Sequence, residues 1–586
     1  MRDIGEIDEG IIIIYSGSIM SSLLLSVYED SLLSSLSLYP SPTKRLSYGT
    51  AGFRDKHDLP LDNIFIKMGI LACLRSYCIA SSTSSLVSTG VMITASHNPE
   101  CDNGVKIVDY NGGMLAQSWE AYAEEFANAN NEIEALNVLK SIAIKNNVNE
   151  KIDGINGIVI IGRDTRSHSV RLSNCIRIGV EALGGTVIDI GEVTTPQLHF
   201  VVQQMNKRPI VPSIPFSVAD ALNEYYSTLC NGFMTLRETK DHEDIVIDAS
   251  AGIGDRAIRD LTSYLNDNYT SNTSDKILSI DIRNGIGSGD VNDECGAEHV
   301  QKGQKPPKSV DSIQDKNKVM CSYDGDADRI VFHSYLEKND TTEWTMFDGD
   351  KISVLFAVLI KNALIDAKLE TSFSMGIVQT AYANGASTHY LIQHGCNIVM
   401  AKTGVKFLHH KAEEFDIGVY FEANGHGTVI FSEKLMKFLN SWSPDKSQDP
   451  VVQKAIERLI ACSRVINQAV GDAISDMLFV LAAMKVLKLD IFSWDNLYKD
   501  LPSKQLKIAT AYKSLITCTD DETRTLTPPG LQEALDIAMK EIPMGRCFIR
   551  PSGTEDVVRV YAEATTSEGV EILTNKAVEA INNFVK

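Results

Sequence analysis

Three aspartates in one short loop constrain this chain more than any other feature of its sequence. Asp324, Asp326 and Asp328 are separated by Gly and Ala and lie between two apolar segments that we expect to be strands. Carboxylates at this spacing converge on one point only where a cation neutralises them. An EF-hand is excluded because Arg329 and Tyr335 stand where that motif needs Gly and Glu. The loop therefore predicts a site for a hard divalent cation such as Mg²⁺, with a solvated acidic turn as the alternative.

A second loop offers a nucleophile. The sequence Thr-Ala-Ser-His-Asn-Pro at 94–99 follows the apolar run 91–93, so Ser96 should lie at the end of a buried strand on a tight loop. Chemistry is often displayed in such loops, although a lone serine there is more often a hydrogen-bonding turn residue. Other loops of the chain supply the groups that a phosphorylated Ser96 would need, and a phosphoserine is therefore the sharper hypothesis.

Two further loops carry groups that suit a phosphorylated sugar. The stretch 422–428, EANGHGT, follows an apolar strand pattern. Its acid and amide suit sugar hydroxyls, and His426 can shuttle a proton. The stretch 550–556, RPSGTED, with Arg559 shortly after it, offers backbone N–H groups, hydroxyls and two guanidiniums that can hold a phosphate. A structural hairpin is the alternative for the first stretch and a polar turn for the second.

Two weaker candidates for anion binding complete the set. Gly49 and Gly52 leave backbone N–H groups open just before Arg54, which can act as a charged arm. The stretch 402–406, KTGVK, stands at the predicted start of a helix. Taken alone, the first of these motifs is typical of a simple turn with a solvated arginine.

Charge balance and cysteine usage limit the functional class. The chain has 586 residues, too many for one core, and its net charge of −21 has both signs interspersed, which argues against nucleic-acid binding. Its eleven cysteines include no C-x-x-C pair, so the pattern predicts neither a zinc ribbon nor a disulfide framework and fits a reducing, cytoplasmic compartment. The uncharged run 11–28 follows an acidic flank, which is the wrong charge for a signal peptide, and we expect no membrane contact.

The order of apolar segments predicts an α/β protein of four domains. Strand and helix patterns alternate through most of the chain, as in mixed, mostly parallel sheets covered by helices, and one helix is expected over 118–140. The last segment lacks this repeat and reads as a smaller α+β domain. Neither a Walker A motif nor a complete dinucleotide fingerprint is present. We expect a poorly ordered extension followed by four domains around a central cleft, with the bounds 1–44, 45–215, 216–340, 341–460 and 461–586.

The four loops together resemble the signature of the α-D-phosphohexomutases. The serine loop TASHNP, the metal loop DGDADR, the sugar loop EANGHGT and the phosphate loop RPSGTED occur in that family's order, and the resemblance covers about residues 45–586. Within the family, the stretches VQTAYANG and VGDAISDML are most similar to the eukaryotic branch that acts on N-acetylglucosamine phosphates. Ala327 and the Ala-Asn pair after Glu422 differ from what relatives acting on glucose or mannose phosphates usually show.

The resemblance implies a phosphoserine mutase that converts N-acetylglucosamine 6-phosphate reversibly into the 1-phosphate. The path would run through a sugar 1,6-bisphosphate, which also serves as primer, and the product would feed the synthesis of UDP-N-acetylglucosamine. The Mg²⁺ ligands implied are Ser96, Asp324, Asp326 and Asp328, and the catalytic residues are Ser96, Lys106, Arg329 and His426. The substrate-binding residues implied are Arg54, Glu422, Ala423, Asn424, Arg550, Pro551, Ser552, Gly553, Thr554 and Arg559. The partners would be small sugar phosphates, with neither nucleic acid nor membrane, and the protein would be a monomer.

Other functions stay open at this point. A phosphoglucomutase or phosphomannomutase of the same family is the nearest alternative, because no residue pattern reveals a pocket for an acetamido group. A metal-dependent phosphatase shares the acidic loop and the phosphate cradle but releases free phosphate. A silent sugar-phosphate binding protein would carry no phosphate on Ser96. Which of Lys106, His426 and His97 moves the proton also stays open.

Overall fold

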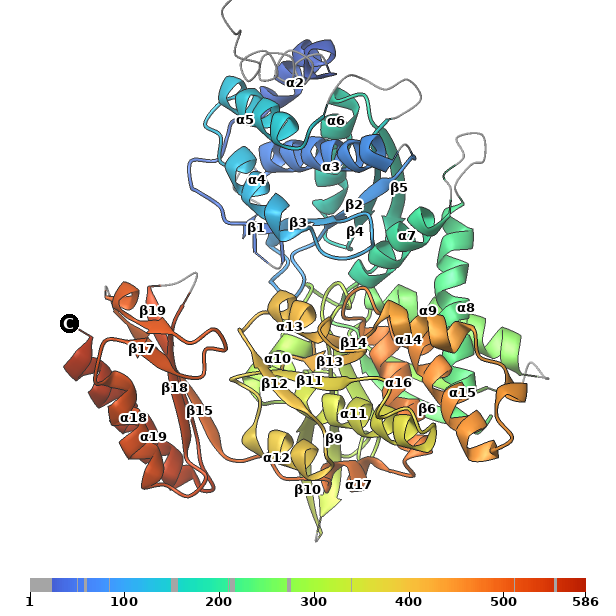
Figure 1. Cartoon of the computed structure of the whole chain (residues 1–586), viewed down its shortest axis with the longest axis vertical. Coiled ribbons are helices and arrows are strands. Elements are labelled where there is room, and N and C mark those ends of the chain that lie inside the picture. Colours follow the sequence, from blue (N-terminus) through green and yellow to red (C-terminus); the bar gives the residue numbers. More distant parts are fainter. Residues whose placement is uncertain are drawn as a thin grey trace, which may run out of the picture.

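The described part of the chain folds into four units in this computed structural model (Figure 1). The first unit holds strands β1 to β5, the second β6 to β10, the third β11 to β14, and the C-terminal unit β15 to β19. The expected α/β class with a smaller C-terminal α+β unit is confirmed. The structure describes residues 24–49, 51–56, 61–83, 85–148, 156–208, 210, 217–270, 276–338, 340–510, 512–552 and 556–585.

The first unit is a five-stranded sheet with the order β1-β3-β2-β4-β5. β2, β4 and β5 are parallel, while β1 and β2 run antiparallel to β3. Because successive side chains of a strand point to opposite faces, Val91 packs in the core under α3 to α6 and Met92 packs on the other face under α7. The elements are β1 (Phe53–Lys56), α3 (Asp62–Thr83), β2 (Ser88–Ile93), β3 (Asp102–Val108), α4 (Gln117–Ala127), α5 (Glu132–Lys145), β4 (Ile158–Arg163), α6 (Ser169–Ala182), β5 (Thr186–Glu192) and α7 (Thr195–Lys207).

The single helix expected over 118–140 is wrong, because the chain breaks there into α4 and α5. The break falls on a run that contains three asparagines. The side chain of Asn131 accepts a hydrogen bond from the N–H of Glu134 and so caps α5. Asparagine competes for backbone hydrogen bonds inside a helix and favours caps, which is the physical reason for the interruption.

Residues 24–44 fold onto the first unit, so the expected poorly ordered extension is wrong for this part of it. Helix α2 (Glu29–Leu36) packs against α5 and α6. Four leucines of this segment join the core of the first unit, and the serines between them had obscured their helical spacing. The leucines are Leu24, Leu25, Leu32 and Leu36. Residues 1–23 of the expected extension lie outside the described residues.

The second unit has the same pattern of parallel and antiparallel neighbours in its sheet as the first unit, although the chain visits the strands in a different order. Its sheet has the order β10-β9-β8-β6-β7, with β6, β7 and β8 parallel and with β9 antiparallel to both β8 and β10. The elements are α8 (Val218–Arg237), β6 (Glu243–Asp248), α9 (Gly254–Tyr269), β7 (Leu278–Arg283), α10 (Ala297–Gly303), β8 (Met320–Tyr323), β9 (Ile330–Lys338) and β10 (Thr341–Phe347).

The third unit is a four-stranded sheet, β12-β11-β13-β14, in which only β14 is antiparallel to its neighbour. Its helices α11, α15 and α16 share one apolar core with α8 of the second unit. The elements are α11 (Gly349–Asp366), β11 (Met375–Thr380), α12 (Gly385–Gln393), β12 (Ile398–Ala401), α13 (Val405–Ala412), β13 (Ile417–Phe421), β14 (Gly427–Phe431), α14 (Glu433–Asn440), a 3₁₀ turn (Pro444–Lys446), α15 (Pro450–Val465), α16 (Ala473–Val486) and α17 (Ile491–Asp495).

Two expected domain boundaries fall inside these elements. A boundary at 340 would separate β10 from β9, although these two strands pair with each other along their length. A boundary at 460 would cut α15. We therefore propose that the third unit begins near residue 348 and that the C-terminal unit begins near residue 500.

The C-terminal unit has an antiparallel three-stranded sheet, β15-β19-β18, and a separate two-stranded ribbon. Helices α18 and α19 cover one face of the larger sheet and give the unit its own core. In Figure 1 this unit, drawn in red, lies beside the third unit. The elements are β15 (Ser503–Ala509), a 3₁₀ turn (Lys513–Leu515), β16 (Thr517–Cys518), β17 (Thr525–Thr527), α18 (Leu531–Lys540), β18 (Arg546–Pro551), β19 (Val557–Glu563) and α19 (Ser567–Phe584).

Among the described helices, α3 is the only one whose length and composition would let it cross a membrane. Most of its most apolar stretch, 78%, is buried inside the protein. It packs against α6 and β2, as expected for a helix at the centre of a domain core.

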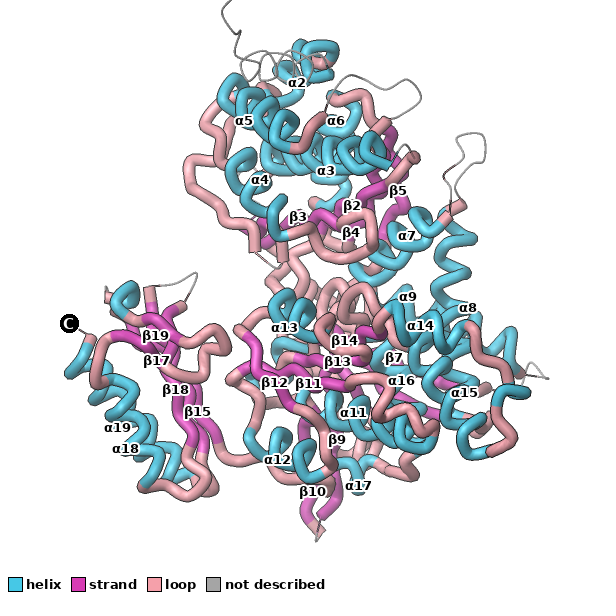
Figure 2. Tube along the Cα trace, in the orientation of Figure 1, coloured by secondary structure: helices cyan, strands magenta, loops and turns pink. Residues whose placement is uncertain are grey.

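The serine, metal and sugar loops follow the carboxyl ends of three strands. The serine loop follows β2, the metal loop follows β8 and the sugar loop follows β13. Each of these strands has a parallel neighbour, and carboxyl ends of parallel strands are where α/β sheets place ligand sites. Figure 2 shows loops gathered where the first unit faces the second and third units.

Candidate active site

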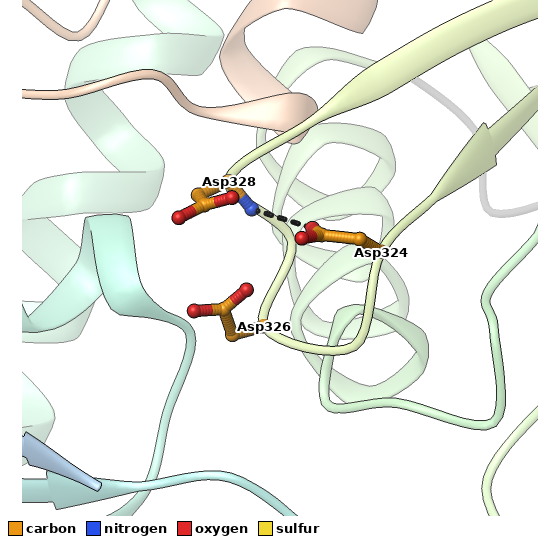
Figure 3. Close-up of side chains that lie close together, drawn as sticks. All are labelled: Asp324, Asp326 and Asp328. Carbon is orange, nitrogen blue, oxygen red and sulfur yellow. Dashed lines mark hydrogen bonds between the residues drawn. The ribbon is translucent and has the colours of Figure 1, made fainter. Parts of the chain in front are cut away.

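The three aspartates of the metal loop surround one point in the buried centre of the molecule (Figure 3). One carboxylate oxygen from each of them lies within 4.8 Å of the other two. The loop turns through Ala327, whose φ is 56°, and the N–H of Asp328 donates to Oδ1 of Asp324 at 3.1 Å. The tight turn thus directs all three carboxylates toward the same point.

Positive charge is needed to hold these carboxylates together. Burial, followed by the charges of Asp328 and Asp326, raises the pKa of Asp324 well above its usual value. Burial acts on Asp328 too, but the charge of Lys106 and the contact with His426 outweigh it and hold the pKa of Asp328 well below its usual value. Nζ of Lys106 donates to Oδ2 of Asp326 at 3.1 Å and to Oδ2 of Asp328 at 3.2 Å. Lysine therefore supplies part of the compensating charge.

The residues present fit a divalent metal ion. Oδ1 of Asp326 is buried and has no hydrogen-bond partner among the described residues. A buried carboxylate oxygen without a partner is costly, and a bound cation would remove that cost. Carboxylate oxygens are the ligands that hard divalent cations prefer. The three aspartates can therefore bind a metal.

Ser96 lies directly against the metal loop. Its Oγ donates to Oδ2 of Asp324 at 2.7 Å, although 228 positions separate the two residues. The backbone of Ser96 has a φ of 52°, and its N–H donates to Oγ1 of Thr94. With 1% of its surface exposed, Ser96 stands in a site from which bulk water is excluded. The structure thus brings together the serine and the acidic trio that the sequence placed in one pocket.

Two arginines and a neutral histidine lie around the same group of loops. Nε of Arg329 lies 3.6 Å from Oδ1 of Asp328. Nη1 of Arg54 donates to Oδ1 of Asn98 in the serine loop at 3.1 Å, and burial followed by the charge of Arg329 lowers the pKa of Arg54. Burial and the same two guanidiniums also lower the pKa of His97 strongly, so that its imidazole stays neutral. Two guanidiniums this close make the pocket attractive to an anion.

The sugar loop is attached through its backbone to Ile330, the residue that follows the metal loop. A Cβ at position 425 would lie 1.7 Å from the carbonyl oxygen of Ile330, so only Gly425 permits this contact. Nδ1 of His426 lies 3.4 Å from Oδ1 of Asp328. Within the loop, Nδ2 of Asn424 donates to Oε2 of Glu422 at 3.3 Å. The neighbouring Ala423 accepts a hydrogen bond from the N–H of Gly349 through its carbonyl group.

The phosphate loop lies in the C-terminal unit. Arg550 and Arg559 are register partners on β18 and β19, and like charges directly opposite each other repel unless an anion lies between them. Nη1 of Arg550 donates to Oε1 of Glu522 at 3.2 Å. Among the described residues, no hydrogen bond or ion pair joins this loop to the metal loop. Pro551 ends β18 and Ser552 is buried, whereas the predicted Gly553 and Thr554 lie outside the described residues.

Comparison with known families and proteins identifies the chain's relatives. A family model described as phosphoacetylglucosamine mutase AMG1, domain III, matches residues 348–489, and the domain II model matches 203–331. The model of the phosphoglucomutase/phosphomannomutase domain I matches residues 67–134 and 127–212. The model of the C-terminal domain of the same family matches residues 528–580. A phosphoacetylglucosamine mutase from Arabidopsis thaliana is 41% identical over 573 residues, which are 95% of this chain and 98% of that protein. The chain belongs to the phosphoacetylglucosamine mutase family.

Solved structures of the phosphoacetylglucosamine mutase family have the same fold. The crystal structure of Aspergillus fumigatus N-acetylphosphoglucosamine mutase in complex with GlcNAc-6P and magnesium is 36% identical, with a TM-score of 0.84 over 95% of this chain and 99% of that one. A variant of the same fungal protein in complex with glucose 1,6-bisphosphate is 37% identical, with a TM-score of 0.82 over 95% and 98% of the two chains. The predicted resemblance to the phosphohexomutases is confirmed.

Sequence reasoning missed several residues that contact the serine and metal loops. Oγ1 of Thr195, in the first turn of α7, donates to Oδ2 of Asp326 at 2.6 Å. Nη1 of Arg329 lies 3.3 Å from Oε2 of Glu298 in α10. Nη2 of Arg166 donates to the carbonyl oxygens of the serine loop. Arg166 carried a signal, because it follows a buried strand, but the other two stand in sequences without a distinctive motif.

Proposed function

We propose that this chain interconverts N-acetylglucosamine 6-phosphate and N-acetylglucosamine 1-phosphate through a phosphorylated Ser96 and a 1,6-bisphosphate. The observation that carries the proposal is the 2.7 Å hydrogen bond from Oγ of Ser96 to Asp324, which places a nucleophile inside a buried acidic cluster. The sugar loop touches the same cluster through His426. Nucleophile, metal ligands and sugar-binding groups are therefore within reach of one substrate.

The three aspartates would hold Mg²⁺, which when bound supplies positive charge to the phosphoryl oxygens. Arg329, beside Asp328, and Arg54, beside Asn98, add charge from the protein on the same side. Phosphoryl transfer needs little covalent assistance, so positioning and charge neutralisation do most of the work. The burial of Ser96 protects its phosphate from hydrolysis.

In the first half of the reaction a sugar hydroxyl oxygen bonds to phosphorus while the bond from phosphorus to Oγ of Ser96 breaks. The hydroxyl proton must leave, and His426 is the better placed acceptor. Its Nδ1 faces Asp328, while its Nε2 is buried and has no hydrogen-bond partner among the described residues. Nζ of Lys106 is already bonded to two carboxylates, which suits charge compensation better than proton transfer. In the second half the bisphosphate turns round and returns its other phosphate to Ser96.

The phosphate that is not reacting would be held by the C-terminal unit. Arg550, Ser552 and Arg559, with Gly553 and Thr554 outside the described residues, provide guanidinium, hydroxyl and backbone donors for it. Arg550 would exchange Glu522 for the phosphate, and this exchange requires the C-terminal unit to close over the pocket. The partners are small sugar phosphates, with a sugar 1,6-bisphosphate as primer. We further propose a cytoplasmic monomer whose product feeds UDP-N-acetylglucosamine synthesis.

A coupled assay tests the proposal. Turnover of N-acetylglucosamine 6-phosphate and of glucose 6-phosphate is compared with Mg²⁺ and a matched bisphosphate primer, and the N-acetyl sugar is expected to be preferred. A preference for glucose or mannose phosphate would instead indicate a phosphoglucomutase or phosphomannomutase. Release of free phosphate without isomerisation would indicate a phosphatase.

Replacement of the nucleophile is the second test. Ser96→Ala should lower kcat on the order of 10⁴-fold and abolish phosphate incorporation seen by intact-protein mass, because no other hydroxyl occupies that position. Ser173→Ala removes a buried hydroxyl from α6, away from the site, and serves as the matched control. Full activity of Ser96→Ala would overturn the proposed mechanism.

A further inference from the structure

The segment 284–296 has no role in the function described so far. It connects β7 to α10, is rich in glycine and contributes Asn292. We propose that Asn292 is a positioning residue that holds the serine loop against the metal loop. This inference rests on the proposed role of Ser96 in phosphoryl transfer and adds a residue that acts on Ser96 from another unit.

The side chain of Asn292 uses both of its amide hydrogens on the serine loop. Nδ2 donates to the carbonyl oxygen of Ser96 and to that of Asn98, both at 2.9 Å. Oγ of Ser250 donates to Oδ1 of Asn292 at 2.6 Å, and the N–H of Asn292 donates to the carbonyl oxygen of Ser250 at 3.0 Å. These partners agree on which amide atom is nitrogen, so the orientation of the side chain is fixed by the network.

The serine loop needs such support because of its backbone. Ser96 has a left-handed φ of 52°, a strained conformation for a residue other than glycine. The metal loop packs on the same carbonyl group, since a Cβ at position 325 would lie 2.7 Å from the oxygen of Ser96 and 3.0 Å from Nδ2 of Asn292. The strained serine, Gly325 and Asn292 therefore meet at one carbonyl oxygen.

Two side chains donate hydrogen bonds to the carbonyl oxygen of Ser96, and they come from different units of the protein. Nη2 of Arg166 donates to the carbonyl oxygens of Ser96 at 3.2 Å and of Asn98 at 2.6 Å, but Arg166 belongs to the first unit, as the serine loop does. Asn292 belongs to the second unit, which carries the metal loop. Of these two residues, only Asn292 holds the serine loop from the unit that carries the aspartates. It therefore helps to set the separation between Oγ of Ser96 and the aspartates, together with the contacts that Lys106 and Thr195 make with the metal loop. A misplacement of about 1 Å at a reacting group costs on the order of 100-fold in rate.

Asn284 is a matched control in the same segment. It also has a left-handed φ, 46° against 63° for Asn292, and its Nδ2 also makes two hydrogen bonds. Those bonds go to Asp248 and Ser309, both within the second unit, at 2.8 Å each. Glycine adopts left-handed φ without strain, so Asn292→Gly and Asn284→Gly each remove one side-chain network without adding strain.

The experiment compares the two glycine variants in the full-length protein with Mg²⁺ and a sugar 1,6-bisphosphate. Asn292→Gly should lower kcat about tenfold and slow the phosphorylation of Ser96, followed by intact-protein mass, by a similar factor, with KM within about twofold of the wild type. Asn284→Gly should keep kcat within about twofold, even where both variants lower Tm. Equal values of kcat for the two variants would overturn the inference.

Ser250→Ala adds a second, milder test. Because Oγ of Ser250 orients the amide of Asn292, this variant should lower kcat about threefold in the wild type and have no further effect in Asn292→Gly. Additive losses would contradict action through Asn292. If Asn292→Gly does not fold, Ser250→Ala alone decides, and an unchanged kcat overturns the inference. A wild type without mutase activity overturns the proposed function instead, so the two failures are distinguishable.

Discussion

The molecule assembles its reacting centre and its distal phosphate grip in different ways. A hydrogen bond between buried groups joins the serine loop to the metal loop, and Asn292 joins the serine loop to the second unit. The second and third units share one apolar core. The C-terminal unit has its own core and meets the third unit through a small aromatic cluster around Tyr382. Ala473 of α16 even donates its N–H to the metal loop, and no comparable bond among the described residues reaches that loop from the C-terminal unit. The reacting end is thus built in advance, and the other end is held by a separately folded unit.

The joint between the third and C-terminal units has the features of a hinge. Asn384 pairs with the backbone of Leu501 in both directions, at 3.0 and 3.1 Å, where the chain enters the C-terminal unit. Glu563 is buried and accepts the N–H of Gly385 and the hydroxyl of Tyr561. These contacts are specific and lie near the point where the chain enters the C-terminal unit, an arrangement that suits rotation of that unit as a body. The proposed path, in which a bisphosphate turns round, requires this kind of opening.

Removal of the metal should have the largest effect, because it acts on the preassembled side. Exhaustive chelation is expected to lower kcat on the order of 10³-fold, since three carboxylates then lack most of their compensating charge. Added Mg²⁺ should restore activity, and a mock-dialysed sample is the control. Activity that survives chelation, with no metal found by elemental analysis, would contradict the metal site.

Loss of an arginine of the phosphate grip should separate the two regions. Arg559→Ala is expected to raise KM for the sugar phosphate about ten- to a hundredfold, because a charge-assisted hydrogen bond is lost. The Mg²⁺ concentration for half-maximal activity should not change. Arg524→Ala removes an exposed arginine of the same unit, paired with Asp536, and should leave both values unchanged. A shift in the Mg²⁺ requirement of Arg559→Ala would show that the two regions are not independent.

Weakening the joint should have a moderate effect. Tyr382→Ala removes the ring that packs edge-on against Phe548 and Tyr561, and kcat is expected to fall about threefold to tenfold because closure starts from a wider set of orientations. Small-angle scattering should report a larger radius of gyration. The matched control is Tyr512→Ala, which removes an exposed ring from the C-terminal unit. An unchanged radius with lowered kcat would assign Tyr382 a local role instead.

The smallest expected effect is a pH dependence of stability near the joint. Burial, followed by the charge of Asp500, raises the pKa of Asp348 from 3.8 to about 7. Between these two pKa values the folded state binds a proton on Asp348 that the unfolded state does not bind. This proton's contribution to folding stability is fully present below the unfolded pKa of Asp348 and is lost as pH rises toward 7. The Tm of the wild type relative to Asp348→Asn should fall between pH 4 and 7 and then level off. Asparagine can keep the cap on α11, so a Tm difference that is constant with pH would contradict the raised pKa.

The sequence by itself determined the elements and the chemistry of the site. Apolar runs predicted most strands, and the spacing of the metal loop alone predicted a cation site because carboxylates at that spacing converge only where positive charge neutralises them. Where the sequence misled, it did so locally. Serines hid the apolar face of α2, and asparagines that cap a helix stood inside an apparently continuous one. Local patterns reveal which groups need partners.

Only the tertiary structure determined which residues are those partners. The contact between Ser96 and Asp324, the hydrogen bonds from Asn292 to the serine loop, and the hydrogen bond from Thr195 to Asp326 all join positions far apart in the chain. No sequence period encodes such contacts, because they depend on how separately folded sheets pack together. The physical reason is that buried charges and strained backbone are stabilised by whichever hydrogen-bond donors the packing of the units brings close to them. The carboxamide of Asn292 and the hydroxyl of Thr195 therefore have no distinctive sequence pattern, and their role is visible only in the folded structure.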